Sequence, residues 1–328
     1  MVTDQLNWIE VSRSKLIQNT NFFKQKIGSN VRLMAMVKAN AYGHGLQLIS
    51  STLSKQVDWF GVNTFEEAIL LRQSKIKNPI LICAPILVQN LPIVLKKNIS
   101  ICCPSLQYLD QIKNFPLKIH LKINTGMNRL GIEPSQLTRA LSVVNASGLH
   151  LEGVYTHFHT PGSDINLFKS LCNIVKKSNP DTICHCANTQ TTMNFPESHL
   201  DMVRIGIGLY TLNPVLSWKC RIIQTRNLSK NTGIGYDHTY ISKFNHSMAI
   251  IPVGYSDGLN RLLSNHRPFL GRIAMNLTAI ENNHMKIGDN FEIIGTTFSA
   301  QKMAKISNTI DYEILSRINP LIPRYLVA

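Results

Sequence analysis

The hydrophobic pattern divides the chain into a long segment with alternating strand-like and helix-like runs and a shorter, mainly strand-like segment. Between about residues 30 and 210, short apolar runs alternate with longer stretches of helical periodicity. The predicted strands cover residues 32–37, 59–62, 79–83, 99–102, 117–123, 149–156, 182–186 and 202–205. Eight strand–helix units in succession predict a (β/α)8 barrel of the TIM type, which belongs to the α/β class.

The pattern changes after Tyr210. Strand-like runs at 221–223, 248–253 and 290–294 are separated by Gly, Asn and Pro, without helical stretches of comparable length. We therefore expect residues 1–211 to form the barrel domain and residues 212–328 to form a mainly β C-terminal domain. The run at 7–11 precedes the first barrel strand, and we expect it to pair with the C-terminal domain.

Composition narrows the classes of function. The chain has 328 residues, of which 44% are hydrophobic, and this is enough for two cores. Its net charge of +15 attracts polyanions, but Lys and Arg are scattered and aromatic residues are not interleaved with them, so we expect no nucleic-acid partner. The N-terminus lacks the pattern of a secretory signal, and no apolar run is long enough to span a bilayer. These features predict a cytoplasmic protein without a membrane partner.

The first candidate for chemistry is Lys38, which directly follows the first predicted barrel strand. Active sites of this fold lie at the carboxyl ends of the strands, where an amine can form an imine with a carbonyl compound. A surface lysine is the ordinary alternative. Against it stand Asn40, Tyr42 and His44, which bring an amide, a hydroxyl and an imidazole into the same glycine-containing turn.

Residues 38–45, with the sequence KANAYGHG, resemble the cofactor-lysine signature of alanine racemases. Further segments resemble the same family in the same order: 122–131 (KINTGMNRLG), 155–158 (YTHF), 187–189 (ANT), 202–206 (MVRIG), 235–236 (GY), 253–258 (VGYSDG) and 271–275 (GRIAM). The resemblance covers nearly the whole chain. It implies an isomerase that uses pyridoxal 5'-phosphate, with a barrel followed by a β domain, in a homodimer whose subunits share their active sites. The reaction interconverts L-alanine and D-alanine, and the D isomer supplies cell-wall peptidoglycan.

The resemblance also implies two catalytic bases. Lys38 carries the cofactor and exchanges the α-proton on one face of alanine, and Tyr236 from the second subunit serves the opposite face. Two bases suit racemisation because the proton leaves one side of a planar carbon and returns to the other. From the sequence alone a tyrosine in a strand is more often a packed aromatic. The assignment of Tyr236 therefore depends on its position in the family pattern.

The remaining site residues are implied by the same resemblance. Arg204 faces the pyridine nitrogen of the cofactor and, because it stays charged, leaves that nitrogen unprotonated. His157 helps to position Arg204. Arg129 binds the phenolic oxygen of the cofactor and the substrate carboxylate. The groups expected to bind phosphate are Tyr42, Asn188, Thr189, Gly206 and Ile207.

Three further residues complete the expected site, which contains no metal. Tyr255 and Met275 of the second subunit line the entrance and bind the substrate carboxylate. Lys122 matches a lysine that is often carbamylated in the family and then braces Arg129. Whether it is carbamylated in this chain stays open, because a free lysine would repel Arg129 and a carbamate would pair with it.

Several positions depart from the family pattern. The departures are Asn124 and Asn276 in place of aspartate, Ala274 in place of a small polar or sulfur-containing residue, Asp237 in place of glycine, and Pro320 in place of a phosphate-binding tyrosine. The link from Arg261 to Gly271 is also shorter than typical, so we expect a rebuilt entrance near Tyr255. None of these changes removes a group that transfers a proton.

Three functions other than alanine racemisation are also considered for this sequence. A racemase for serine or for several amino acids would have the same site, because the width of the pocket cannot be read from the sequence. A metal-dependent hydrolase on the same barrel is suggested by His157 with His159, and by Cys184, His185 and Cys186 one strand later. A non-catalytic pyridoxal-phosphate carrier would need neither a second base nor the β domain.

Overall fold

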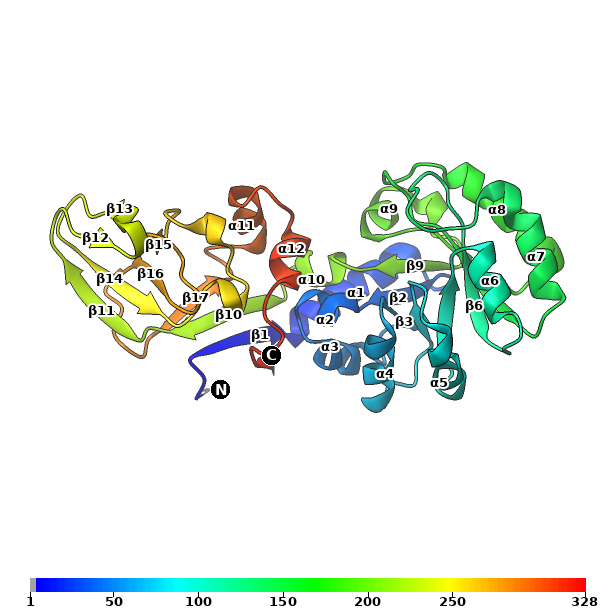
Figure 1. Cartoon of the computed structure of the whole chain (residues 1–328), viewed down its shortest axis with the longest axis horizontal. Coiled ribbons are helices and arrows are strands. Elements are labelled where there is room, and N and C mark those ends of the chain that lie inside the picture. The colour runs from blue at the N-terminus through cyan, green and yellow to red at the C-terminus, as the bar shows by residue number, and fades with distance from the viewer. Residues whose placement is uncertain (1–3) are drawn as a thin grey trace. The chain divides into compact units, whose positions relative to one another are not determined.

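The protein consists of two compact units, which a computed structural model describes over residues 4–328 (Figure 1). The barrel unit comprises Leu16–Ala41 and Leu46–Asn213. The β unit comprises the residues up to Lys15, the short segment Tyr42–Gly45 and Pro214–Ala328. Each unit has its own sheets and its own buried core.

The barrel unit contains eight parallel strands in the order β8-β7-β6-β5-β4-β3-β2-β9. The strands are β2 (Arg32–Met36), β3 (Trp59–Val62), β4 (Ile80–Ile82), β5 (Ser100–Cys103), β6 (Lys118–Lys122), β7 (His150–Tyr155), β8 (Ile183–His185) and β9 (Met202–Ile205). All eight lie where the hydrophobic pattern predicts them, and no end differs by more than one residue.

The barrel is nearly closed. β9 pairs with β2, and backbone hydrogen bonds bridge the remaining gap beside β8, from Asp201 N to Cys184 O at 3.1 Å and from Arg204 N to Ala187 O at 2.9 Å. The Asp201 carboxylate accepts a further hydrogen bond from Cys184 N at 2.7 Å. The predicted TIM-type barrel is thereby confirmed.

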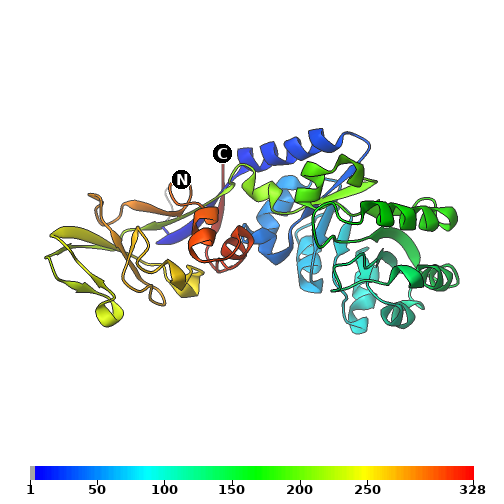
Figure 2. The ribbon, with the colours of Figure 1, turned by 90° about the horizontal axis from the view of Figure 1, so that it is seen from above.

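Helices cover the outside of the strands (Figures 1 and 2). They are α1 (Arg13–Ile27), α3 (Leu46–Leu53), α4 (Phe65–Gln73), α5 (Leu91–Lys96), α6 (Leu106–Ile112), α7 (Leu137–Asn145), α8 (Ile165–Ser178), α9 (Thr189–Asn194) and α10 (Gly208–Thr211). The start of α4 shows how the sequence fixes these helices. Thr64 and Glu67 form a capping box, in which each side chain bonds the backbone N–H of the other residue.

The β unit is built from two four-stranded sheets and a hairpin. One sheet has the order β17-β10-β1-β18, and the other has the order β11-β14-β16-β15. The strands are β1 (Asn7–Ser12), β10 (Leu216–Arg221), β11 (Gln224–Leu228), β12 (Gly233–Ile234), β13 (Tyr240–Ile241), β14 (His246–Ile251), β15 (Phe269–Leu270), β16 (Thr278–Glu281), β17 (Asn290–Ile294) and β18 (Arg324–Val327). β1 runs antiparallel to β10, with Ile9 opposite Trp218.

The only helices after β17 are short: α11 (Ala300–Ile306) and α12 (Asp311–Ser316). The prediction of a mainly β C-terminal domain is therefore confirmed. Within residues 4–328, every helix is too short or too polar to cross a membrane.

Candidate active site

Lys38 begins a left-handed turn at the end of β2. The segment α2 (Lys38–Tyr42) has φ angles of 52° to 53° from Ala39 to Tyr42. A left-handed conformation costs roughly 1–2 kcal/mol for each residue other than glycine, so tertiary contacts must hold this turn. Ala39 N donates to the Glu67 carboxylate at 2.6 Å, and the Asn40 side chain accepts from Leu46 N at 2.8 Å. The turn fixes the backbone around Lys38, whose side chain is half-buried.

The far end of the same turn packs within the β unit. The buried Tyr42 ring lies 6.0 Å from the Tyr312 ring, and Arg324 Nε donates to Gly43 O at 3.1 Å. A Cβ atom at Gly43 would lie 2.0 Å from Leu315 O, and its φ of 84° is also unfavourable for other residues. Glycine at this position therefore allows the Tyr42–Gly45 segment of the β unit to approach α12 closely.

Arg204 is buried in the third position of β9 and is held by four hydrogen bonds. Its Nη1 donates to His185 Nδ1 at 2.8 Å and to His185 O at 2.9 Å. Its Nη2 donates to Thr156 O at 2.6 Å and to Cys186 O at 3.0 Å. The guanidinium carbon also lies 5.3 Å from the centre of the Tyr155 ring. No carboxylate within residues 4–328 forms a salt bridge with it.

A histidine other than the expected His157 bonds Arg204. The resemblance gave the positioning of Arg204 to His157, but the imidazole that bonds the guanidinium is that of His185. The physical reason is strand register. His185 ends β8, the strand that lies beside β9, whereas His157 lies beyond the end of β7.

The pKa of His157 reflects burial and the positive charges of the expected site residues. Burial, followed by the positive charges of Arg204, Arg129, Lys122 and Lys38, lowers the pKa of His157 to about 3. Four cationic side chains from three different parts of the barrel unit therefore act on one imidazole. His157 is neutral at physiological pH, and its surroundings favour an anionic ligand.

The depressed pKa predicts how stability depends on pH. An unfolded histidine has a pKa near 6.5, so between pH 6.5 and 3 the unfolded chain binds a proton that folded His157 does not. Stability is therefore lost as pH falls below 6.5. The free energy of unfolding should fall between pH 7.5 and pH 5, and in His157→Asn this fall should be smaller, by at most about 2 kcal/mol. The measurement is urea denaturation of the cofactor-free chain at both pH values. An identical pH dependence in the two proteins would contradict this.

Lys122 is buried at the end of β6, and its pKa is lowered, chiefly by burial and also by the nearby charges of Arg129 and Arg204. Its ammonium lies 5.6 Å from the centre of the Tyr155 ring. No hydrogen bond or salt bridge to an acidic group is present for it in the described chain. These surroundings favour the neutral amine.

The loop that carries the exposed Arg129 is organised by Asn124. The Asn124 side-chain oxygen accepts from Asn128 N at 3.0 Å, and its amide nitrogen donates to the Glu133 carboxylate at 2.8 Å. An aspartate at position 124 would have no proton to donate and would repel Glu133. The asparagine therefore suits this loop, although the family pattern has aspartate.

Thr189 joins the two turns that are expected to bind phosphate, at residues 188–189 and 206–207. The Thr189 hydroxyl oxygen accepts from Gly206 N at 3.2 Å and from Gly208 N at 3.3 Å. The hydroxyl proton is left without an acceptor among residues 4–328. Asn188 caps α9 by accepting from Thr191 N at 3.0 Å. Position 208 requires a small residue, because a Cβ atom there would lie 2.6 Å from Thr189 Cγ2.

Tyr236 lies in the β unit, in a 3₁₀ turn (Tyr236–His238) between β12 and β13, and is 66% exposed. Asp237 has a φ of 56°, which explains why glycine is usual at this position. Its carboxylate pairs with Arg272 Nη1 at 2.5 Å.

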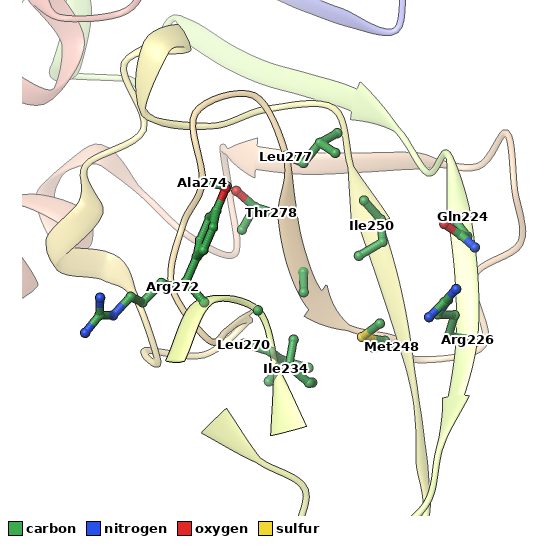
Figure 3. A pocket seen from close by; sticks show the side chains of 13 residues that line it. Gln224, Arg226, Ile234, Met248, Ile250, Leu270, Arg272, Ala274, Leu277 and Thr278 are labelled. Atoms are coloured by element: carbon green, nitrogen blue, oxygen red, sulfur yellow. The ribbon is translucent and has the colours of Figure 1, made fainter. Parts of the chain in front are cut away.

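Tyr236 lines a cavity of about 560 Å³ in the β unit. Its floor includes Met248, Ile250 and Leu270, and Arg272 and Arg226 lie at opposite edges (Figure 3). A mostly apolar cavity beside an exposed aromatic residue is a surface that a partner molecule can cover.

Tyr255 and Met275, both expected at the entrance, belong to two segments that are bonded together. Tyr255 N donates to Ala274 O, and Ser256 N donates to Met275 O, both at 3.0 Å. A Cβ atom at Gly254 would lie 2.3 Å from these two carbonyl oxygens, so glycine allows the approach. The side chains of Tyr255 and Met275 are 43% and 55% exposed.

The residues that suggested a metal-dependent hydrolase do not converge. His159 is exposed and lies 3.6 Å from Asp164, and the buried Cys186 thiol donates to Ser198 O at 3.2 Å. In the chain from residue 4 onward, no three His, Cys, Asp or Glu side chains are grouped to hold a metal ion. The cations around His157 would also repel a divalent metal.

The fold defines the class of protein as a TIM-type barrel followed by a β domain, with Lys38, Lys122 and Arg204 at or beyond the carboxyl ends of barrel strands. Residues 11–214 match the family described as "Alanine racemase, N-terminal domain", and residues 215–326 match "Alanine racemase, C-terminal domain". The chain therefore belongs to the alanine racemase family, whose members are isomerases.

Individual relatives and solved structures that resemble this chain are also alanine racemases. The chain is 33% identical over 365 aligned positions to alanine racemase 1 of Caldanaerobacter subterraneus, covering 96% of this chain and 93% of that protein. It is similarly 33% identical to alanine racemase of Leptospira interrogans, covering 98% of this chain and 96% of that protein. Among solved structures, the alanine racemase of Clostridium difficile 630 superposes with a TM-score of 0.92 at 26% identity, covering 100% and 97% of the two chains. The Bacillus anthracis alanine racemase with bound L-Ala-P gives 0.90 at 27% identity, covering 100% and 96%.

Proposed function

We propose that this protein interconverts L-alanine and D-alanine with pyridoxal 5'-phosphate, using one catalytic base from each of two subunits. The observation that carries the proposal is the match of both domains to the alanine racemase family, in a chain that has Lys38, Lys122 and Arg204 at or beyond the carboxyl ends of barrel strands. A site with this much positive charge suits a phosphorylated cofactor and a substrate carboxylate.

The residues present fit pyridoxal phosphate. This cofactor supplies an aldehyde that a lysine amine can bond and a ring that withdraws electrons from the α-carbon. Lys38 would hold it covalently, and the proton of the Thr189 hydroxyl is available for a phosphate oxygen. Tyr42, Asn188, Gly206, Ile207 and His157 would complete the binding site.

Arg204 would set the electronic character of the cofactor. An arginine cannot accept a proton, so the pyridine nitrogen that faces it stays unprotonated. The four hydrogen bonds of Arg204 occupy the N–H groups of Nη1 and Nη2 and leave one N–H, that of Nε, for that nitrogen. The expected consequence is weaker electron withdrawal, which restrains side reactions such as transamination.

Arg129 would bind the substrate carboxylate, and Lys122 would brace it as a carbamate. Burial and the lowered pKa of Lys122 favour the neutral amine that reacts with carbon dioxide. The resulting negative charge would pair with Arg129, whereas an ammonium would repel it.

The second base would come from a second copy of the chain. In this proposal residues 1–211 bind the cofactor, and residues 212–328 supply Tyr236, Tyr255 and Met275 to the partner. The support is their exposure together with that of two neighbouring apolar residues, Leu262 (62%) and Leu277 (49%). An exposed apolar surface of this kind is typical of an interface. The product D-alanine would serve peptidoglycan synthesis in the cytoplasm.

A direct assay tests this function and its substrate. We expect purified protein with added pyridoxal phosphate to convert L-alanine into a racemic mixture, measured by chiral chromatography. Serine should react with a kcat/KM about ten- to a hundredfold lower, because a pocket that fits the methyl group of alanine discriminates only modestly against an added hydroxyl. Protein that binds the cofactor and yields no D-alanine would refute the proposal, and equal rates for serine would widen the substrate class.

A further inference from the structure

A chain of hydrogen bonds connects Arg204 to a carboxylate that lies farther towards the amino-terminal ends of the barrel strands. Arg204 Nη1 lies 2.8 Å from His185 Nδ1, His185 Nε2 lies 2.9 Å from His120 Nδ1, and His120 Nε2 lies 3.4 Å from Glu152 Oε2. The four residues come from β9, β8, β6 and β7. Both histidines are fully buried, and Glu152 is only slightly exposed.

The carboxylate end of this chain is anchored. Glu152 Oε2 also accepts a hydrogen bond from the hydroxyl of Ser100, and Lys118 Nζ lies 3.7 Å from Oε1. Ser100 and Lys118 are the first residues of β5 and β6, so the anchor lies towards the amino-terminal ends of the strands. The Arg204 end lies among residues that follow the strands.

Packing prevents the two imidazoles from turning. The His185 ring stacks on Tyr155 with centroids 4.9 Å apart and an interplanar angle of 9°, and the His120 ring meets the Trp59 ring edge-on at 5.5 Å. A Cβ atom at Gly153 would lie 2.3 Å from His120 Nδ1. Glycine at position 153 therefore provides the space that the His120 ring occupies.

The chemistry of the end groups fixes the direction of every hydrogen bond. A guanidinium only donates, so His185 Nδ1 must present a lone pair and carry its proton on Nε2. That proton points to His120 Nδ1, so His120 must carry its own proton on Nε2, where the carboxylate of Glu152 accepts it. The reverse arrangement would place the His185 Nδ1 proton against Arg204.

An extra proton on either histidine is equally unfavourable. A second proton on His120 would place its Nδ1–H against the Nε2–H of His185. A second proton on His185 would place its Nδ1–H against the guanidinium of Arg204. Burial lowers the pKa of His185 well below its ordinary value and, despite Glu152, also lowers that of His120. Both rings are therefore neutral dipoles aligned between a cation and an anion, the arrangement in which successive hydrogen bonds strengthen one another.

We propose that Glu152 is a positioning residue for Arg204, because its carboxylate and the guanidinium together hold His120 and His185 in the tautomers that present the His185 lone pair to Arg204. The inference deepens the proposed function and rests on it for the role of Arg204 towards the cofactor. It assigns a function to a residue that contacts neither cofactor nor substrate.

Three variants of the full chain test the proposal. Glu152→Ala removes the acceptor and the charge, Glu152→Gln keeps an acceptor oxygen, and Lys118→Ala removes the salt-bridge partner of Glu152 without touching a histidine. The first measurement is ¹⁵N NMR of the imidazole nitrogens in cofactor-free protein, which reports the tautomers directly. The second is the dissociation constant of pyridoxal phosphate together with kcat and KM for alanine.

We expect Glu152→Ala to shift the His120 and His185 nitrogen signals away from the single-tautomer pattern. It should also lower kcat or cofactor affinity about ten- to a hundredfold, by analogy with the hydrogen-bond partners of metal-binding histidines, with KM for alanine within about twofold. Glu152→Gln should restore most of both properties, and Lys118→Ala should match the wild type.

The proposal requires the histidine tautomers to change together with kcat or the affinity for pyridoxal phosphate. Wild-type tautomers in Glu152→Ala would overturn it, and so would altered tautomers with unchanged kcat and cofactor affinity. If Glu152→Ala does not fold, Glu152→Gln becomes the test. Loss of the charge should then lower cofactor affinity or kcat a few-fold. A Glu152→Gln variant with fully wild-type properties would overturn the proposal. The NMR measurement needs no cofactor, so failure of the racemase function would be recognised separately.

Discussion

Replacing Lys38 by alanine is expected to lower alanine racemisation by at least about ten-thousandfold. Lys38 would perform two tasks, because it attaches the cofactor and exchanges the α-proton on one face of the substrate. Loss of the amine removes both tasks together. The measurements are D-alanine formation from L-alanine and the amount of pyridoxal phosphate that stays with the protein after gel filtration.

The fold should survive this substitution. The Lys38 side chain is half-buried, and the left-handed turn after it is held by the backbone of Ala39 and the side chain of Asn40 rather than by the amine. Lys38→Arg is the matched control, since it keeps the positive charge but cannot form an imine, and it should be as inactive as the alanine variant. Substantial activity in either variant would show that another residue holds the cofactor.

The sequence predicted the barrel accurately because its strands are buried on both faces. Such strands read as continuous apolar runs bounded by polar residues, and all four residues of β3 and of β9 are buried. The β unit was predicted only in outline. Strands as short as β12 and β15, with two residues each, are too short to show the period-2 alternation by which a strand is recognised in a sequence.

The candidate site was predicted as a set of residues, and the structure adds the side chains that hold them. Polar residues inside otherwise apolar barrel strands were the available signal: His120 in β6, Glu152 in β7 and His185 in β8. A buried histidine is more often a satisfied core residue than a functional one, so nothing in the sequence pattern joins them. Their connection depends on strand order and register, which only the fold supplies.

The left-handed turn after Lys38 was likewise outside the reach of sequence reasoning. Alanine and tyrosine have no preference for positive φ, and local propensity would predict an ordinary helix for residues 38–42. Tertiary contacts, such as those of Ala39 N with Glu67 and of Asn40 with Leu46 N, override that preference. The strain therefore marks a position where the backbone is shaped for function.

Replacing Tyr236 by phenylalanine is expected to lower racemisation about 10²- to 10⁴-fold, the contribution of a well-placed general base, while cofactor binding and stability stay unchanged. Tyr236 is 66% exposed, and its hydroxyl has no hydrogen-bond partner within residues 4–328, so the substitution removes one oxygen and little packing. By the proposed mechanism Tyr236 removes the α-proton of L-alanine. In D₂O the variant should therefore exchange the α-proton of D-alanine through Lys38 and form almost no L-alanine, as measured by NMR.

Mixing the two inactive variants tests which subunit supplies each base. If Lys38 of one subunit works with Tyr236 of the other, a heterodimer of Lys38→Ala and Tyr236→Phe contains one site with both bases and one site with neither. Half of the dimers are heterodimers after random exchange of subunits, so the mixture should recover about a quarter of wild-type activity. If both bases came from the same subunit, every site would lack one base and mixing would recover nothing. Recovery of activity therefore requires a shared active site, which neither single variant can demonstrate.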